Sequence, residues 1–369
     1  MSPKLAVLGT GLIGGSIALG ARAARPEVVV AGHDVDAAAL SAAVESGAIT
    51  EGHLSPEHAV SGAEFVVVCV PIDAMPATLR RVAAAVPDDA IVTDVGSAKR
   101  SLVEEGERLF GGRFVGGHPM AGSERHGIAA ADPRLFEGAW WILTPTEATS
   151  EHAYSAVTSF VARLGATPVA VDPSTHDALV ARLSHVPQLT ASALVEVAIA
   201  AGDREALLGL AAGGFRDVTR IASSNPDLWV GILRANRVAV LEALEGLRGR
   251  LGEVSSMVAE GRWEQLRVFL ERARSARLGL FAKPDFDGAP VTLSLLVPDR
   301  PGLLAEVTTA AGRLGANIED LRIVHSTEGG RGRLELVVTG DERAEILAAA
   351  LEVLGHHVER MPPGVEDYG

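Results

Sequence analysis

The chain has 369 residues, of which 47% are hydrophobic and 22% are charged, so it is long enough to bury the cores of two or three globular domains. Its 33 basic and 47 acidic residues give a formal net charge of −14, which argues against nucleic acid or an anionic membrane as the main partner. The only cysteine, Cys69, excludes internal disulfides and multi-cysteine zinc sites. Apolar runs of about eight residues are too short to span a bilayer, so we expect a soluble cytoplasmic protein.

Residues 1–172 alternate short runs of β-branched residues with alanine-rich stretches that suit helices. The runs are Lys4–Gly9, Val28–Asp34, Phe65–Pro71, Ala90–Asp94, Arg113–Gly117, Trp140–Thr144 and Thr167–Val171. Short buried strands that alternate with helices are typical of βαβ units around a parallel sheet. We therefore predict an α/β chain in which residues 1–172 form a Rossmann-type parallel sheet.

Residues 173–283 lack strand-like runs and carry long patterns of alanine, leucine, valine and arginine instead. Examples are Leu189–Ala201, Leu228–Glu260 and Trp263–Leu280. Several patterns are apolar on more than one face, as expected for helices buried between subunits. We predict an all-helical dimerisation domain over residues 173–283, and hence a homodimer.

A linker and a third pattern follow the helical region. Ala282–Pro290 contains two prolines, a glycine and two aspartates, a composition typical of a linker. The strands predicted after it are Val291–Val297, Asn317–Ser326, Arg333–Thr339 and His356–Arg360, and the helices are 301–314 and Asp341–Leu354. This βαββαβ order predicts a ferredoxin-like domain over residues 290–360.

The strongest local motif follows the first strand, where Gly9–Gly14 has the sequence GTGLIG and opens a helix. Gly9 permits a tight turn, Gly11 lets the backbone approach a pyrophosphate, and Gly14 allows the helix to pack closely on the sheet. Free N–H groups at the helix start would then bind the phosphates. The predicted cofactor-binding residues of this motif are Gly9, Thr10, Gly11, Leu12, Ile13 and Gly14.

Asp34 ends the second strand, 20 residues after Gly14. A carboxylate there accepts hydrogen bonds from the adenine ribose and repels a 2′-phosphate, so NAD is favoured over NADP. The alternative is that Asp34 only caps the next helix, although Asp36 could do this instead. Val70 and Pro71 end another strand and are expected to line the nicotinamide side of the cleft, although a structural strand stop explains Pro71 equally well.

Two loops after later strands carry the polar groups expected for catalysis, 94–99 (DVGSAK) and 116–124 (GGHPMAGSE). His118 lies between glycine and proline on irregular backbone, and an imidazole is the usual group that takes a proton as hydride leaves an alcohol carbon. Ser97 could hydrogen-bond the same hydroxyl. From the spacing alone, a structural role for His118 is an equal alternative.

Two motifs interrupt the apolar helical region, 184–188 (SHVPQ) and 213–222 (GGFRDVTRIA). Glycines and polar groups between apolar helices are costly unless they line a cavity or pair internally. Arg216 and Arg220 lie four residues apart on one helical face, where either could hold a carboxylate. The alternative is an ion pair with Asp217 or another acid.

In this order, the glycine motif with Asp34 and the four later motifs resemble the prephenate/arogenate dehydrogenase family of tyrosine biosynthesis, over residues 4–280. The resemblance implies that His118 accepts the proton of the ring hydroxyl with Ser97 in support, and that Arg220 binds a substrate carboxylate. With the arginine pair included, the expected substrate-binding residues are Ser123, Glu124, His185, Gln188, Gly213, Arg216, Arg220 and Trp229.

The implied reaction is the NAD-dependent oxidative decarboxylation of prephenate to 4-hydroxyphenylpyruvate, which requires no metal. The enzyme's task is then mostly orientation and proton removal. Several prephenate-using members have SHLPH where this chain has SHVPQ, so Gln188 replaces a histidine on the substrate side. A neutral glutamine suits either the keto group of prephenate or the ammonium of arogenate, so arogenate dehydrogenase is the alternative activity.

Towards the C-terminus, 297–304 (VPDRPGLL) and 315–318 (GANI) resemble the ACT family of amino-acid-sensing domains. Gly302 lets the turn expose backbone N–H groups to a ligand carboxylate at a helix start. The implied effector is L-tyrosine, with contacts expected from Asp299, Gly302, Leu303, Asn317 and Ile318. The alternative is a domain that serves only dimer contacts.

Two other classes of function were weighed against the dehydrogenase. A 3-hydroxyacid dehydrogenase would use a catalytic lysine in its helical domain, but none of the lysines lies within the predicted helices. The lysines are Lys4, Lys99 and Lys283. A regulator that senses NAD and an amino acid would keep the glycine motif and the ACT-like domain, but would not need His118, Ser97 and Arg220 together.

Overall fold

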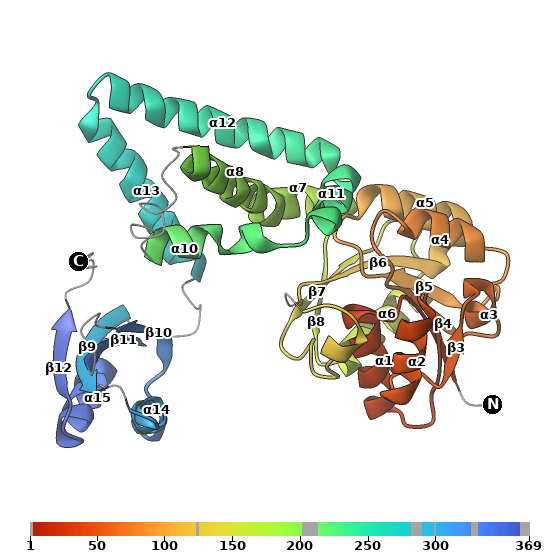
Figure 1. Cartoon of the computed structure of the whole chain (residues 1–369), viewed down its shortest axis with the longest axis horizontal. Coiled ribbons are helices and arrows are strands. Elements are labelled where there is room, and N and C mark those ends of the chain that lie inside the picture. The colour runs from red at the N-terminus through yellow and green to blue at the C-terminus, as the bar shows by residue number, and fades with distance from the viewer. Residues whose placement is uncertain are drawn as a thin grey trace. The chain divides into compact units, whose positions relative to one another are not determined.

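The computed structural model describes residues 3–122, 125–200, 213–281, 290–298, 300–325 and 331–361. By their contacts the residues group into two compact units, Met1–Ser256 and Met257–Gly369. The first unit holds a large sheet and its helices, and the second holds a small sheet (Figure 1). Apart from Pro290, the predicted linker lies outside the described residues. The domain bounds 1–172, 173–283 and 290–360 stay predictions.

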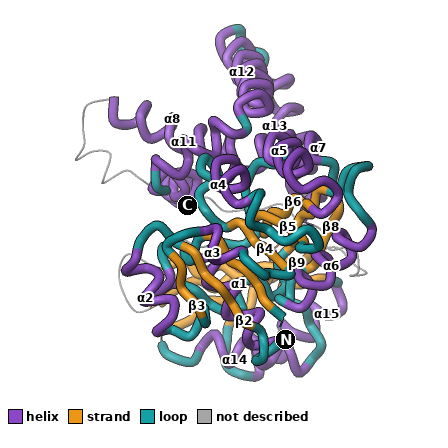
Figure 2. The backbone as a smooth tube through the Cα atoms, turned by 90° about the vertical axis from the view of Figure 1, so that its right-hand side faces the viewer, coloured by secondary structure: helices purple, strands orange, loops and turns teal. Residues whose placement is uncertain are grey.

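The large sheet has eight strands in the order β3-β2-β1-β4-β5-β6-β7-β8. Their bounds are β1 Lys4–Leu8, β2 Val29–His33, β3 Glu51–His53, β4 Phe65–Val68, β5 Ile91–Asp94, β6 Phe114–Pro119, β7 Trp140–Thr144 and β8 Thr167–Ala170. Figure 2 shows strands of this sheet, in orange, running side by side. All seven predicted strands are present, and the Rossmann-type sheet is confirmed.

Two features of the sheet differ from the sequence expectation. Strand β3 was not predicted, because its residues, Glu-Gly-His, carry no β-branched side chain. Strand β7 pairs with β6 in antiparallel fashion, whereas the other neighbours are parallel. The connection before β7 contains a short 3-10 turn, Ile128–Ala130, in place of the crossover helix that a parallel return requires.

Helices cover both faces of the sheet, as in a doubly wound fold. Their bounds are α1 Leu12–Ala24, α2 Ala37–Glu45, α3 Pro56–Val60, α4 Met75–Val82, α5 Arg100–Phe110 and α6 Glu151–Arg163. In β1, Val7 belongs to the core on the face of α1, α2 and α6, and Leu8 to the core on the face of α3, α4 and α5. Alternate residues of one strand therefore build two cores, as the pleat of a strand dictates.

The second half of the first unit is helical, as predicted. The elements are α7 Pro173–Val180, a π-helical turn Ala181–His185, α8 Val186–Ala200, α10 Gly213–Thr219, a 3-10 turn Arg220–Ser223, α11 Pro226–Ala235 and α12 Arg237–Ala259. The pattern predicted over Leu228–Glu260 is two helices, because the chain turns at Asn236. Asn236 is buried and its side chain donates a hydrogen bond to the backbone oxygen of Asp177, which fixes that turn.

One helical run among the described residues, Pro173–Ala200, is long and apolar enough to cross a membrane by length and composition. The expectation from short apolar runs missed it, because isolated polar residues divide the runs but leave the average hydropathy of the helix high enough for a span. Those residues include His176, Asp177, His185 and Gln188, whose side chains are buried within the unit. One run of this kind is weak evidence for a membrane span, because helices that pack inside a protein pass the same test of length and composition.

The second unit begins with helix α13, Trp263–Phe281, and contains a four-stranded antiparallel sheet in the order β10-β11-β9-β12. Its strands are β9 Pro290–Pro298, β10 Ile318–His325, β11 Arg331–Thr339 and β12 His357–Met361, and its helices are α14 Leu303–Arg313 and α15 Asp341–Val353. Leu293, Leu336 and Leu347 are fully buried between the sheet and the helices. The predicted βαββαβ arrangement is confirmed.

Candidate active site

The glycine motif forms the turn between β1 and α1. Gly9 has a φ of +102°, and a Cβ there would lie 2.6 Å from the backbone oxygen of Cys69. A Cβ on Gly14 would lie 1.9 Å from the backbone oxygen of Gly9, so only glycine lets α1 approach the turn this closely. Gly11 has no such neighbour within 4 Å, which leaves its backbone accessible to a ligand at the start of α1.

Asp34 lies beside this turn at the end of β2. Its Oδ2 accepts hydrogen bonds from the backbone N–H (2.9 Å) and the hydroxyl (3.0 Å) of Thr10. The helix cap that Asp34 might have supplied comes from Asp36, which accepts a hydrogen bond from the N–H of Ala38 at 2.8 Å. A glycine cradle with a carboxylate at the next strand end fits the pyrophosphate and adenine ribose of NAD, and that carboxylate repels a 2′-phosphate.

The neighbouring strand ends complete this edge of the sheet. Strand β4 ends at Val68, and Val70 is half-buried while Pro71 is exposed. Burial raises the pKa of the Cys69 thiol, and the nearby Asp94 carboxylate raises it further, so the thiol stays protonated and unreactive. Because β1, β4, β5 and β6 are parallel, the glycine turn, Val70, the loop that carries Ser97 and the end of β6 with His118 all lie at their carboxyl ends. The prediction of irregular backbone at His118 is wrong, because His118 belongs to β6 and pairs with Ile142 of β7.

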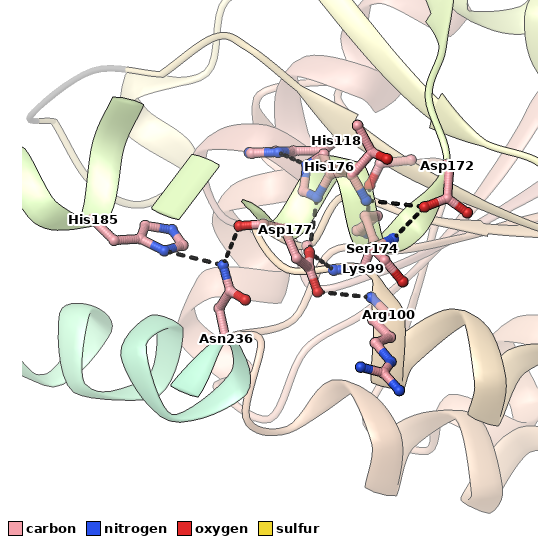
Figure 3. Close-up of polar contacts among 12 residues, drawn as sticks. Lys99, Arg100, His118, Asp172, Ser174, His176, Asp177, His185 and Asn236 are labelled. Atoms are coloured by element: carbon pink, nitrogen blue, oxygen red, sulfur yellow. Dashed lines mark hydrogen bonds and ion pairs between the residues drawn. The ribbon is translucent and has the colours of Figure 1, made fainter. Parts of the chain in front are cut away.

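His118 is one end of a hydrogen-bonded chain of three side chains (Figure 3). Its Nδ1 lies 2.8 Å from Nε2 of His176, and Nδ1 of His176 lies 2.9 Å from Oδ1 of Asp177. His176 is fully buried, and Asp177 is nearly so. Burial, followed by nearby His176 and Lys99, lowers the pKa of His118 well below its ordinary value, so the imidazole is neutral at pH 7.

A buried ion pair holds the part of β6 that precedes His118. The ammonium of Lys99 contacts the carboxylate of Asp94 and donates a hydrogen bond to the backbone oxygen of Gly117 at 2.7 Å. Asp94 in turn accepts hydrogen bonds from the backbone N–H groups of Gly117 (3.1 Å) and Gly96 (2.7 Å). Both charged side chains are fully buried. Together they tie the loop after β5 to the residue that precedes His118.

Ser97 was expected to support His118. It lies half-buried on the loop after β5, and the partner of Nδ1 of His118 is Nε2 of His176. Its role beside the substrate hydroxyl therefore stays a prediction. Ser123 and Glu124, expected to border substrate and cofactor, lie outside the described residues.

The SHVPQ motif lies where the π-helical turn meets α8. His185 is buried, its Nδ1 lies 3.3 Å from the side-chain nitrogen of Asn236, and its ring meets Trp229 edge to face at 6.0 Å. Burial lowers the pKa of His185 to about 4. Gln188 is only 6% exposed, and its Oε1 has no hydrogen-bond partner among the described residues. Such a buried acceptor is costly unless a ligand satisfies it.

The second helical motif is on the surface of the single chain. Gly213 and Arg216 belong to α10 and Arg220 begins the following 3-10 turn, and all three residues are exposed.

Two of the predicted effector residues, Gly302 and Leu303, lie at the start of α14. Gly302 has a φ of +89°, which favours glycine, and Leu303 is buried beneath it. Asn317 and Ile318 are half-buried, and the Asn317 amide donates a hydrogen bond to Glu319. Asp299 lies outside the described residues.

Sequence reasoning missed the partners of His118. His176 and Asp177 are adjacent in the chain, and such a pair in the first turns of a helix ordinarily points to solvent. The sequence did contain one indication of their role, because His176 and Asp177 lie within an otherwise apolar helix, where buried polar groups need hydrogen-bond partners. Among the described residues, no group of three His, Cys, Asp or Glu side chains is arranged to hold a metal ion.

Known protein families match three successive parts of this chain. The family models for the prephenate dehydrogenase nucleotide-binding domain, the prephenate dehydrogenase dimerization domain and the ACT domain match residues 17–170, 172–272 and 291–356. Prephenate dehydrogenase of Bacillus subtilis is 32% identical over 347 residues, which are 93% of this chain and 94% of the relative.

Two solved structures are also similar over most of their length. Prephenate dehydrogenase from A. aeolicus, in complex with hydroxyphenyl propionate and NAD+, has a TM-score of 0.71 and 32% identity, and the match covers 76% of this chain and 99% of that one. Synechocystis arogenate dehydrogenase has a TM-score of 0.66 and 31% identity, with 74% and 98% covered. The glycine cradle and Asp34 agree with the NAD of the first structure. This chain belongs to the prephenate dehydrogenase family, as an NAD-dependent prephenate or arogenate dehydrogenase with an ACT domain.

Proposed function

We propose that the protein catalyses the oxidative decarboxylation of prephenate to 4-hydroxyphenylpyruvate in tyrosine biosynthesis. The observation that carries the proposal is the position of His118 at the same sheet edge as the glycine turn, with Nδ1 bound to His176 and Nε2 without a partner among the described residues. The relatives from Bacillus subtilis and Lactococcus lactis, which match 93% and 95% of this chain, are both prephenate dehydrogenases.

The residues of the chain have simple tasks in this reaction. NAD, when bound, supplies the acceptor for the hydride that leaves C4 of the substrate ring. Nε2 of His118 takes the proton of the C4 hydroxyl, which becomes a carbonyl as the ring carboxylate leaves as carbon dioxide, and the same proton returns to the phenolic oxygen. The low pKa of His118 keeps the imidazole neutral and able to accept that proton.

Arg216 and Arg220 are the proposed carboxylate-binding residues. Both are exposed in the single chain, on elements next to helices that expose large apolar side chains.

The apolar side chains of these helices point to a subunit interface. Leu183, Val197 and Val238 are 75%, 71% and 64% exposed. Large apolar side chains with this much exposure are typical of an interface, and the matching family model is that of a dimerization domain. We infer a homodimer, to be tested by light scattering, in which the arginines lie near the subunit interface. A cytoplasmic location stays a prediction.

Arogenate is the second candidate substrate, and one observation favours it. The unpartnered Oε1 of Gln188 is a hydrogen-bond acceptor, which an ammonium satisfies and a keto oxygen does not. The relatives include both kinds of enzyme, since the solved Synechocystis protein is an arogenate dehydrogenase. If Gln188 binds the ammonium, Gln188→His lowers kcat/KM for arogenate relative to prephenate by about tenfold, the loss of one charge-assisted hydrogen bond. An unchanged ratio removes Gln188 from substrate choice.

The proposed activity is tested by mixing the full chain with NAD and either prephenate or arogenate, and following the absorbance of the reduced cofactor. Reduction with prephenate, at a kcat/KM higher than with arogenate, supports the proposal. Preference for arogenate supports the second candidate. No reduction with either substrate contradicts both.

We also propose that L-tyrosine binds the ACT domain and inhibits the enzyme. The support is the exposed turn at Gly302, which leaves backbone N–H groups at the start of α14 for a ligand carboxylate. Gly302→Val introduces a β-branched side chain at a φ of +89° and should abolish inhibition while leaving the uninhibited rate unchanged. Equal inhibition of this variant and the parent protein would contradict the proposed site.

A further inference from the structure

The contacts around Asp177 fix where the protons of two histidines lie. Asp177 accepts hydrogen bonds from the backbone N–H of Lys99 (2.7 Å) and that of Arg100 (3.0 Å), as well as from His176. Burial by itself raises the pKa of Asp177, but the hydrogen bonds from His176 and these N–H groups outweigh it and hold the pKa below its ordinary value. The carboxylate is therefore ionised and can only accept hydrogen bonds.

This ionised acceptor determines the tautomer of each ring in turn. Because the Asp177 carboxylate can only accept hydrogen bonds, Nδ1 of His176 carries a proton and donates a hydrogen bond to that carboxylate. A His176 ring whose single proton lies on Nδ1 has a bare Nε2, which can only accept a hydrogen bond from Nδ1 of His118. Neutral His118 is thereby left with a proton on Nδ1 and a lone pair on Nε2, the form that a general base requires.

We propose that His176 and Asp177 are positioning residues that hold His118 in its Nδ1–H tautomer, with Nε2 ready to accept a proton. The consequence for turnover rests on the proposed function, whereas the tautomer does not. Neither residue needs to touch the substrate for this role. The arrangement serves the same purpose as the buried carboxylate that orients the histidine of a serine protease.

The same two residues join the helical region to the nucleotide-binding sheet. Helix α7 starts at an Asp172 cap, whose carboxylate accepts hydrogen bonds from the N–H groups of Ser174 and Thr175. From the next turn, Asp177 reaches the start of α5 and His176 reaches the end of β6, as Figure 3 shows. The orientation of His118 thus depends on α7 being seated against the loop that carries Ser97.

The tautomer can be observed directly in the full-length protein labelled with 15N-histidine. Nitrogen chemical shifts distinguish a protonated ring nitrogen from a bare one, and the signals of His118 are identified by their loss in His118→Asn. We expect a protonated Nδ1 and a bare Nε2 in the parent protein at neutral pH. In Asp177→Asn the side-chain amide can donate to His176, so the proton of His118 should move towards Nε2. The opposite tautomer in the parent protein would overturn the proposal.

Matched variants separate positioning from mere stability. Asp177→Asn and His176→Phe should lower kcat by about 10²–10⁴-fold, with the dissociation constant for NAD changed less than about threefold. His176→Gln retains an acceptor for Nδ1 of His118, and its kcat should exceed that of His176→Phe by at least about tenfold. His152→Phe, which removes an exposed histidine on α6, should change neither kcat nor the His118 signals.

The outcomes of these experiments are distinct. Equal losses in His176→Gln and His176→Phe, with an unchanged His118 tautomer in both, would show a structural role and overturn the proposal. If Asp177→Asn does not fold, the parent spectrum and the two His176 variants still decide. An enzyme that reduces no NAD with either substrate, yet shows the expected tautomer that moves in His176→Phe, contradicts the proposed function and leaves the positioning role standing.

Discussion

The glycine turn offers a sharp test of the cofactor site, because two of its glycines are required for different reasons. A methyl group on Gly14 would lie 1.9 Å from the backbone oxygen of Gly9 and 3.0 Å from a methyl carbon of Val7. The backbone oxygen cannot move unless the turn opens. We therefore expect Gly14→Ala to cost about 1–3 kcal/mol of stability, or about 5 °C in the midpoint of thermal unfolding, and to weaken NAD binding as well.

Gly11→Ala is the matched control. No atom lies within 4 Å of the added methyl group, and Gly11 has a φ of −70°, which alanine adopts without strain. Its unfolding midpoint should stay close to that of the parent, within about 0.5 kcal/mol of stability. NAD affinity, measured by titration calorimetry, should nevertheless fall at least about tenfold, because the methyl group occupies the path of the pyrophosphate. Parental NAD affinity in Gly11→Ala would refute this assignment of the cofactor site.

Two further predictions concern the charged groups around His118. His118 must be neutral to act as a base, and its pKa is lowered well below the ordinary value of 6.5. We therefore expect kcat/KM to stay constant as the pH falls through 6.5 and to decline only well below that pH. A kcat/KM that is already half-maximal at or above pH 6.5 would contradict this prediction. Lys99→Met leaves the buried Asp94 carboxylate without its cation and should lower the free energy of unfolding by denaturant by about 3–5 kcal/mol. The control Arg100→Met, which changes an exposed side chain, should lower it by less than about 0.5 kcal/mol. Similar losses in both variants would exclude a structural role for the ion pair.

The elements that depend on local pattern could be predicted from the sequence. The glycine turn, Asp34 and the seven strand-like runs all have neighbours close in the chain that define them. The βαββαβ domain followed from strand and helix order alone. Strand β3 and the antiparallel return into β7 could not be predicted, because the first has no β-branched residue and the second depends on the absence of a crossover helix.

The contacts of the site could not be predicted from local sequence patterns, because they join segments that are far apart in the chain. His118 and His176 are 58 residues apart, and Lys99 and Asp177 are 78 apart. Lys99 was noted as part of the 94–99 motif and as a lysine outside the predicted helices, but its fully buried ion pair was not predicted. A buried charge is costly unless a partner satisfies it, so each buried charged side chain here needs a partner. Which side chains are buried is known only from the assembled sheet and α7.

The central claim is that His118 removes the substrate proton while NAD is reduced and carbon dioxide is lost. It is tested most directly by measuring reduced NAD and released carbon dioxide together, for the parent protein and for His118→Asn with prephenate. The account predicts equal amounts of the two products from the parent, and a rate lower by about 10²–10⁴-fold in the variant with NAD affinity retained. Undiminished turnover by His118→Asn, or NAD reduction without release of carbon dioxide, would contradict it.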